Sequence, residues 1–289
     1  MTVLIFFGAM IAPFFYSICN HLDKHLLRKF FGEDDKSKVG RLMLFSAFLS
    51  IVTVPVAYSY DPNVLDISLV GILTLLLVGV INIGLLWGYL MAMDEDEPTV
   101  VIIFYQLVPV IGLVLGRQFL NETISVTQGI AMVLIMAGAI VMTFAQDEDG
   151  RVTLKLRTMG FMLLASVGWA SESVIFKWVA LEENVWQSLF WEGLSETFIG
   201  VLLFLFIPSW RQQFLSVFRE KKPKQIGLNV TNEVLFNIGN MAAYLMVVLI
   251  PVALNLLMNS FHPIFVFLIG AVLSRFAPQL ATESATGRW

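Results

Sequence analysis

Residues 82–91 read NIGLLWGYLM, and residues 237–246 read NIGNMAAYLM. Six of the ten positions are identical, with Asn first, Gly third and Tyr eighth in both copies. An Asn or Tyr side chain is costly inside an apolar segment, because no water replaces its lost hydrogen bonds. A costly decamer that occurs twice predicts a duplicated unit whose polar residues line a shared cavity.

The composition around these decamers is typical of an integral membrane protein. Hydrophobic residues make up 57% of the 289 positions and charged residues 14%, and the mean hydropathy is +0.79. Soluble domains carry roughly 25% charged residues and would have to hide such an apolar excess. The single cysteine, Cys19, excludes an intrachain disulfide framework and a cysteine metal cluster. We therefore expect no metal and no cofactor.

Nine stretches are long and apolar enough to span a bilayer, which needs about 20 residues. They are Val3–Asn20, Val39–Tyr58, Ile67–Met93, Pro98–Phe119, Val126–Ala145, Gly160–Val179, Leu189–Ile207, Gly227–Leu249 and Pro251–Phe276. The N-terminal MTVLIFFGAM lacks the basic region of a cleaved signal peptide, so we expect it to begin the first helix. These lengths predict an all-α polytopic membrane protein and exclude a transmembrane barrel of short alternating strands.

Lysine and arginine are concentrated in one set of alternating loops. That set holds Lys24, Arg28, Lys29, Lys36, Lys38, Arg41, Arg151, Lys155, Arg157, Arg211, Arg219, Lys221, Lys222, Lys224, Arg275 and Arg288. The opposite set holds only Arg117 and Lys177. The positive-inside rule then predicts cytoplasmic basic loops and an external N-terminus, in a plasma membrane or a bacterial inner membrane.

Two further segments repeat together with the decamer. YSICNHLDK (16–24) aligns with WASESVIFK (169–177), and EPTVVIIFYQLVPVIGLVLG (97–116) aligns with IPVALNLLMNSFHPIFVFLIG (250–270) after a one-residue slip. The repeat unit has five helices, an odd number, so the second copy is expected to insert upside down. We expect a first repeat at 1–145, a cytoplasmic linker at 146–158 and a second repeat at 159–289. Inverted repeats with Pro-interrupted helices are typical of alternating-access transporters.

The duplicated unit, the EPT…P…G fourth helix and LNETISVTQGIAMVLIMAGAIV (120–141) resemble the EamA-like members of the drug/metabolite transporter superfamily. The resemblance implies ten helices and the transport of small molecules. By the repeat, Glu283 corresponds to Glu122, yet the SATGRW that follows cannot form an apolar helix. We therefore expect nine helices, with the second repeat truncated after four. The family is commonly drawn with a cytoplasmic N-terminus, whereas the charges of this chain predict the opposite.

Polar and aromatic residues within four predicted helices are candidate substrate-binding positions. Five residues of the eighth helix, from Asn229 to Tyr244, follow at spacings of four, four, three and four, which places them on one face. Such residues either join helices by hydrogen bonds worth roughly 0.6–2 kcal/mol or line a cavity, and for this stripe we favour the cavity. The candidates are Asn82, Tyr89, Trp169, Asn237, Asn240, Tyr244, Asn255, Asn259 and His262.

Four glutamates within predicted spans are candidate proton-coupling residues: Glu172, Glu192, Glu196 and Glu233. A charged group at mid-membrane costs roughly 2.5–3.5 kcal/mol on insertion scales, and such residues usually mark ion or substrate paths. Glu192 and Glu196 are one helical turn apart, and burial beside a like charge favours the protonated form of a carboxyl group. The alternative is that this pair lies near a membrane face, because its helix begins close by at Gln187.

Other conspicuous residues have ordinary structural interpretations. Lys24 and Lys177 end equivalent helices, where lysines are expected to reach the membrane interface, with Asp23 in the headgroup region beside Lys24. Glu122 is expected to cap the fifth helix from the tight turn before it. The third-position glycines of the two decamers, Gly84 and Gly239, should allow neighbouring helices to approach closely.

These features predict a secondary transporter, an exporter of small metabolites or amphipathic compounds, that works by alternating access with protons as coupling ion. There is no G-x-x-x-x-G-K-[ST] motif for ATP. The expected partners are a small-molecule substrate, the lipid bilayer and protons, without nucleic acid, and the oligomeric state stays open. Two alternatives also stay open: an intramembrane enzyme acting on lipid head groups and a non-transporting truncated remnant. The enzyme is disfavoured because the chain has only three histidines and neither H-E-x-x-H nor G-x-S-x-G.

Overall fold

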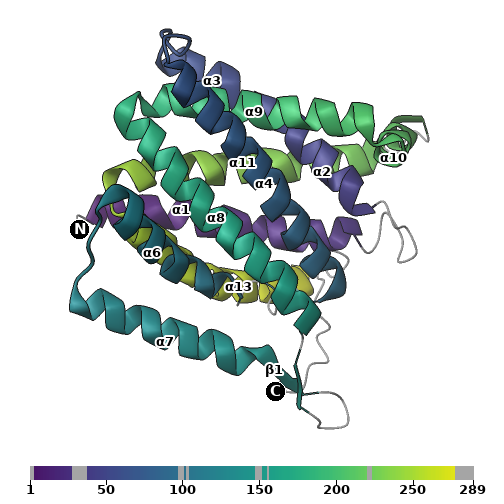
Figure 1. Ribbon diagram of the computed structural model, residues 1–289. Helices are drawn as coiled ribbons and strands as arrows, with labels where there is room; N and C mark the ends of the chain where they lie inside the picture. Colours follow the sequence, from purple (N-terminus) through teal and green to yellow (C-terminus); the bar gives the residue numbers. More distant parts are fainter. Residues whose placement is uncertain are drawn as a thin grey trace.

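The computed structural model describes residues 3–27, 38–96, 101, 104–146, 152–154, 156–219 and 223–276 (Figure 1). Among these residues, seven helical segments are long and apolar enough to cross a membrane, and a shorter apolar one covers Tyr105–Leu120. The protein is therefore an all-α polytopic membrane protein, as expected. The last expected segment, with Glu283, falls at 277–289 and lies outside the described residues.

Every expected span corresponds to helical structure over most of its length. The helices are α1 (Val3–His25), α2 (Lys38–Leu49), η2 (Ser50–Val52), α3 (Thr53–Tyr60), α4 (Leu69–Glu95), η3 (Tyr105–Leu107), α6 (Val108–Leu120), α7 (Val126–Thr143), α8 (Leu156–Glu182), α9 (Val185–Phe206), α10 (Pro208–Arg219), α11 (Pro223–Leu249), α12 (Val252–Met258), η4 (Asn259–Phe261) and α13 (His262–Phe276). The expected linker also contributes β2 (Val152–Leu154), which pairs antiparallel with β1 (Phe144–Gln146).

Prolines interrupt the fourth and ninth expected spans in the same way. Pro109 lies in the first turn of α6 directly after η3, and Pro263 lies in the first turn of α13 directly after η4. A proline has no N–H, and its ring clashes with the carbonyl four residues earlier. The preceding turn consequently tightens into the 3-10 form. The helices therefore change hydrogen-bond pattern where the two aligned segments each carry a proline.

The lipid-facing side of the bundle is apolar. On α4, Leu69, Leu73, Leu77 and Val80 are each at least half exposed, and they follow at helical spacing along one stripe. Asn82 on the same helix is buried. Because hydrocarbon offers no hydrogen bonds, the polar side chains turn inward and the leucines turn outward.

Close helix packing depends on particular glycines. A Cβ on Gly88 of α4 would lie 2.8 Å from the carbonyl oxygen of Phe161 on α8, so these helices meet where the side chain is smallest. Gly239 of α11 behaves as expected, since a Cβ there would lie 3.0 Å from the ring of Tyr16. The expectation for Gly84 is wrong, because a Cβ there would meet nothing within 4 Å.

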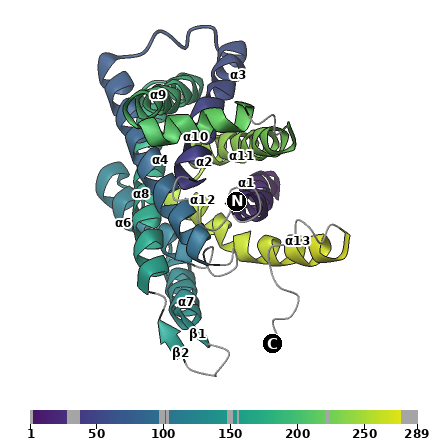
Figure 2. The same ribbon diagram turned by 90° about the vertical axis from the view of Figure 1, so that its right-hand side faces the viewer.

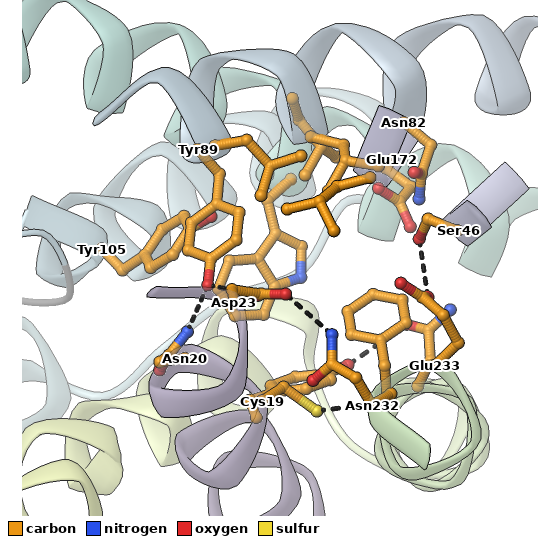
Figure 3. Close-up of a pocket in the computed structure, with 18 of the residues that line it drawn as sticks. Cys19, Asn20, Asp23, Ser46, Asn82, Tyr89, Tyr105, Glu172, Asn232 and Glu233 are labelled. Atoms are coloured by element: carbon orange, nitrogen blue, oxygen red, sulfur yellow. Dashed lines mark hydrogen bonds between the residues drawn. The ribbon is translucent and has the colours of Figure 1, made fainter. Parts of the chain in front are cut away.

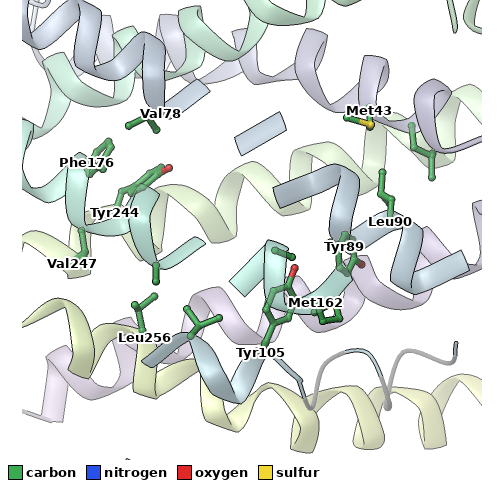
Figure 4. Close-up of a cluster of buried hydrophobic side chains, with 14 of the residues drawn as sticks. Met43, Val78, Tyr89, Leu90, Tyr105, Met162, Phe176, Tyr244, Val247 and Leu256 are labelled. Carbon is green, nitrogen blue, oxygen red and sulfur yellow. The ribbon is translucent and has the colours of Figure 1, made fainter. Parts of the chain in front are cut away.

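The buried apolar cluster runs the length of the bundle, with aromatic pairs at separate places within it (Figure 4). Phe176 of α8 and Tyr244 of α11 stack with ring centroids 3.8 Å apart. Tyr89 and Tyr105 form a second stacked pair at 6.1 Å. Both tyrosines of the two decamers are thus fixed by ring contacts as well as by their hydroxyl groups.

Helix α10 was not expected from the hydropathy. It lies at the end of the bundle away from the N-terminus (Figures 1 and 2). Pro208 begins it, and Phe214 packs on Phe45 of α2 with ring centroids 4.7 Å apart. Its length of 12 residues is too short to span, and its apolar face rests on α2 while Arg211 and Arg219 flank it.

Candidate functional site: a polar cavity between the helices

A cavity of about 80 Å³ lies between α1, α2, α4, α8 and α11, with Tyr105 and His262 also in its wall (Figure 3). Sites for drug-sized ligands usually measure roughly 300–1,000 Å³. The cavity in this conformation is therefore the size for a small solute. Its wall combines carboxyl, amide and phenol groups with an apolar remainder.

Asp23 of α1 is a carboxylate of the cavity wall whose two oxygens both accept hydrogen bonds. Its Oδ2 accepts a hydrogen bond from Tyr89 Oη at 2.7 Å, and its Oδ1 accepts one from Asn232 Nδ2 at 2.7 Å. Asn20 Nδ2 in turn donates to Tyr89 Oη at 2.8 Å. Figure 3 shows Asp23 between Tyr89 and Asn232. Asp23 is only 9% exposed, so its side chain faces the interior of the bundle and not its outer surface.

Glu172 connects the cavity with two glutamates outside its wall. Tyr244 Oη donates to Glu172 and lies 3.0 Å from Glu192 Oε1. Glu196 lies one helical turn from Glu192 on α9, and Ser50 Oγ donates to Glu196. Tyr244 therefore connects the cavity acid to Glu192, with Glu196 next to it on α9.

The depth of the α9 pair in the membrane stays a prediction, but both side chains are buried within the bundle. Glu192 is 1% exposed and Glu196 5% exposed. The wide exposed face of α9 is formed instead by apolar residues such as Phe198 and Leu205. Both carboxyl groups therefore point into the bundle.

Glu233 of α11 is the third carboxyl group in the cavity wall. Ser46 Oγ of α2 donates to its Oε2 at 2.8 Å (Figure 3). Two turns further along α11, Asn240 Oδ1 accepts from Tyr16 Oη at 3.2 Å. Glu172 also has Asn82 as a hydrogen-bond partner. The three acids of the cavity thus come from α1, α8 and α11, each held by a neutral partner from another helix.

Five of the nine expected substrate-binding residues lie in the cavity wall: Asn82, Tyr89, Trp169, Asn240 and His262. Tyr244 lies one step behind it, at Glu172. Asn237 donates to the carbonyl of Glu233 within its own helix at 2.8 Å, and Asn255 donates to the carbonyl of Ala243 at 3.2 Å. Asn259 donates to Asn255. These three asparagines donate hydrogen bonds to backbone carbonyls and do not line the cavity.

Sequence reasoning missed the part of the polar wall that α1 supplies. Tyr16, Asn20 and Asp23 follow at spacings of four and three, the same spacing that singled out the stripe on α11. Of these three, only Asp23 was considered, and it was expected in the headgroup region. Asn232 and Ser46 carried no comparable pattern, and only the packing of α2 on α11 brings Ser46 to Glu233.

Both helix-ending lysines are buried, so the expectation that they reach the interface is wrong. Lys24 is 0% exposed, and its Nζ donates to the carbonyls of Met93 and Asp96 at the end of α4. Lys177 is 6% exposed and donates to the carbonyl of Ile250 at 2.7 Å, at the end of α11. Each lysine therefore ties one long helix to the end of another.

Glu122 completes the contact at Lys177. Its Oε1 lies 2.7 Å from Lys177 Nζ, and its Oε2 accepts from the backbone N–H of Val252 at 2.7 Å. The capping role expected for Glu122 is thus present but at α12, not at the fifth helix. The helix N-terminus favours the negative charge there.

Comparison with known proteins supplies one match. The family model "EamA-like transporter family" matches residues 3–144, which cover α1 to α7. No curated protein matches the chain. The match agrees with seven membrane-length helices around an internal polar cavity. Over residues 3–144 the chain therefore matches the EamA-like transporter family, whose members are membrane transporters of small molecules.

Proposed function

We propose that the chain is a secondary transporter that exports a small molecule in exchange for protons. The observation that carries the proposal is the hydrogen-bonded line from the cavity acid Glu172 through Tyr244 to Glu192, with Glu196 one helical turn away on α9. Acids inside a membrane protein usually mark ion or substrate paths, because their burial is costly. Here the line begins in the cavity wall and ends on α9, so a proton held by the line is next to the place for a substrate.

The exchange follows from competition at Glu172. With a proton on it, Glu172 is neutral and the cavity is less attractive to a positively polarised ligand. When substrate binds, the proton passes through the Tyr244 hydroxyl to the pair on α9 and from there leaves the bundle. A transporter needs two conformations that differ in their affinity for each ligand. Protonation of Glu172 in one conformation and substrate binding in the other supplies that difference.

The proposed moving parts are the two halves, 1–145 and 159–289, joined by the linker at 146–158. Support comes from contacts that correspond when the halves are exchanged. α1 packs on α11, and α4 packs on α8. The repeat matches α1 with α8 and α4 with α11, so exchanging the halves turns the first pair into the second. The cavity lies between these pairs. Rocking of one half against the other would open it to each side in turn.

The orientation proposed from the basic loops is supported by α10. This helix carries Arg211 and Arg219 and lies at the opposite end of the bundle from the N-terminus (Figure 1). With α10 at the cytoplasmic surface, the N-terminus is outside. The inward proton gradient of a bacterial or plasma membrane would then drive export.

The test uses purified protein in liposomes that are acidic inside, with a radiolabelled panel of small cations, zwitterions, neutral compounds and anions outside. An exchanger accumulates its substrate in exchange for escaping protons, and a protonophore abolishes the accumulation. Glu192→Gln and Glu196→Gln should lose gradient-driven accumulation but retain substrate exchange between equal concentrations, because neither residue lines the cavity.

Glu182→Gln is the matched control, since Glu182 is an exposed glutamate at the end of α8. It should accumulate substrate like the unmodified protein. Wild-type accumulation in both α9 variants would overturn the coupling. Failure of every compound in the panel to accumulate under any gradient would overturn the transport itself.

A further inference from the structure

The charge of the cavity wall is acidic. Asp23, Glu172 and Glu233 all contribute carboxyl groups, and among the described lining residues there is no lysine or arginine. Lys24, next to Asp23 in sequence, instead directs its Nζ to the carbonyls of Met93 and Asp96. Electrostatic attraction is stronger in the low dielectric of a protein interior than in water. The wall therefore favours a positively charged ligand.

The groups that two asparagines of the wall leave without a hydrogen-bond partner are acceptors. Because a carboxylate only accepts, Tyr89 must donate its proton to Asp23, and Asn20 must then donate to Tyr89. Asn232 likewise donates to Asp23 through Nδ2. These donations orient both amides, and they leave Asn20 Oδ1 and Asn232 Oδ1 without a hydrogen-bond partner.

The two unpaired oxygens are a second observation, independent of the acids. Asn20 is 4% exposed and Asn232 3% exposed, and both belong to the cavity wall. A buried acceptor without a donor is destabilising, and a ligand with N–H groups would remove that cost. The ring nitrogens of His262, also in the wall and 2% exposed, have no hydrogen-bond partner either.

Aromatic rings form another part of the wall. Trp169 stands edge-to-face with Tyr105 at 4.8 Å and with Tyr16 at 5.8 Å between ring centroids. The faces of aromatic rings attract organic cations, most strongly when the cation is desolvated. The same rings exclude strongly hydrated metal ions, whose preferred ligands are oxygens alone.

We propose that the cavity binds a small organic ammonium ion that carries N–H donors and a short apolar group. The acids supply the charge, Asn20 Oδ1 and Asn232 Oδ1 accept its hydrogen bonds, and the aromatic rings contact its carbon atoms. The inference deepens the proposed function by naming the substrate class, and it rests on that function for the step of transport. Binding itself does not depend on proton coupling.

The experiment measures equilibrium binding of radiolabelled butylammonium to the full chain in detergent, without any gradient. Unlabelled butylammonium should displace the label. Tetramethylammonium, which has charge but no N–H group, should compete at least tenfold more weakly. Butanol and butyrate should not compete. Equal competition by tetramethylammonium would overturn the hydrogen-bonding argument, and competition by butyrate or butanol would overturn the cationic class.

Variants locate the site. Asp23→Asn should weaken butylammonium binding at least tenfold, whereas Glu182→Gln on the exposed end of α8 should bind like the unmodified protein. If Asp23→Asn fails to fold, as judged by its thermal unfolding, Glu233→Gln carries the same expectation. Unchanged binding in a folded Asp23→Asn or Glu233→Gln protein would overturn the assignment to this cavity.

The two proposals fail in different ways. If butylammonium fails to bind while some other compound of the panel accumulates in acidic liposomes, the ammonium site is wrong and the transporter stands. If butylammonium binds as described but Glu192→Gln and Glu196→Gln keep gradient-driven accumulation, the ammonium site stands and the proton line is wrong.

Discussion

At the scale of single residues, the tyrosines of the two repeated decamers have different partners. Tyr89 joins Asp23 of α1, whereas Tyr244 joins Glu172 of α8 and Glu192 of α9. In the aligned segments, Asp23 corresponds to Phe176, and Phe176 stacks on Tyr244. Each tyrosine thus contacts the equivalent position of its own half, but through a hydroxyl in one and a ring face in the other. The difference leaves the Tyr244 hydroxyl available to bridge two acids.

Tyr244→Phe tests that bridge. The ring stacking on Phe176 at 3.8 Å is kept and only the hydroxyl is lost. Because a hydrogen bond to a charged group contributes roughly 1.5–3 kcal/mol, we expect gradient-driven accumulation to fall about tenfold or more. Uptake into acidic liposomes measures it. Tyr58→Phe, at an exposed tyrosine of α3, is the control. Normal accumulation by Tyr244→Phe would remove Tyr244 from the proton line.

Two glycines offer a matched test of packing. A Cβ on Gly200 would lie 2.6 Å from the Cβ of Ala47, whereas one on Gly84 would meet nothing within 4 Å. Gly200→Ala should lower the free energy of unfolding by roughly 1–3 kcal/mol, as overpacking does. Gly84→Ala should raise it by about 0.5–1 kcal/mol through helix propensity. Denaturant titration in detergent measures both, and equal effects at the two positions would contradict the described helix packing.

At the scale of elements, hydropathy sufficed to find the spanning helices, because each must present about 20 apolar residues to lipid. It could not find α10, whose apolar face rests on α2 and whose mean composition is polar. Nor could it show that Glu122 caps α12 rather than its own neighbouring helix. This cap joins residues that are far apart in the sequence, so the local sequence pattern around Glu122 does not predict it.

The contact between α8, α12 and the turn at Glu122 is expected to hold one side of the bundle closed. Lys177→Met leaves the Glu122 carboxylate without its cation, and removing one partner of a buried pair costs roughly 3–5 kcal/mol. We expect a loss of that order in the free energy of unfolding. The double variant Lys177→Met, Glu122→Gln should recover part of the loss, since no charge is then left unpaired. Additive losses in the double-mutant cycle would show that the two side chains do not interact.

At the scale of the whole molecule, the sequence was sufficient for the fold class and for about half of the candidate site. The stripe on α11 and the acids of α9 were visible because polar residues in an apolar helix stand out at once. Asp23 and Asn20 were not assigned, because a polar residue near the end of a span also fits the membrane interface. Only the depth of α1 in the bundle, with Asp23 9% exposed, separates the two interpretations.

The proposed orientation of the molecule can be tested by labelling. In a Cys19→Ser background, Asp66→Cys between α3 and α4 and Gln212→Cys in α10 both place a thiol at an exposed position. An impermeant maleimide added to intact cells should label Asp66→Cys, and it should label Gln212→Cys only after lysis. The reverse pattern would place the N-terminus in the cytoplasm. Labelling of both in intact cells would contradict a single orientation.

The central claim is that substrate and proton compete at the cavity, with Glu172 as the shared group. Its most direct test is to add butylammonium to the purified protein in weakly buffered detergent solution and record the released protons with a pH indicator. The unmodified protein should release protons in proportion to bound butylammonium, and Glu172→Gln should bind the ligand with little or no release. Binding by the unmodified protein without proton release, or equal release by Glu172→Gln, would contradict the account.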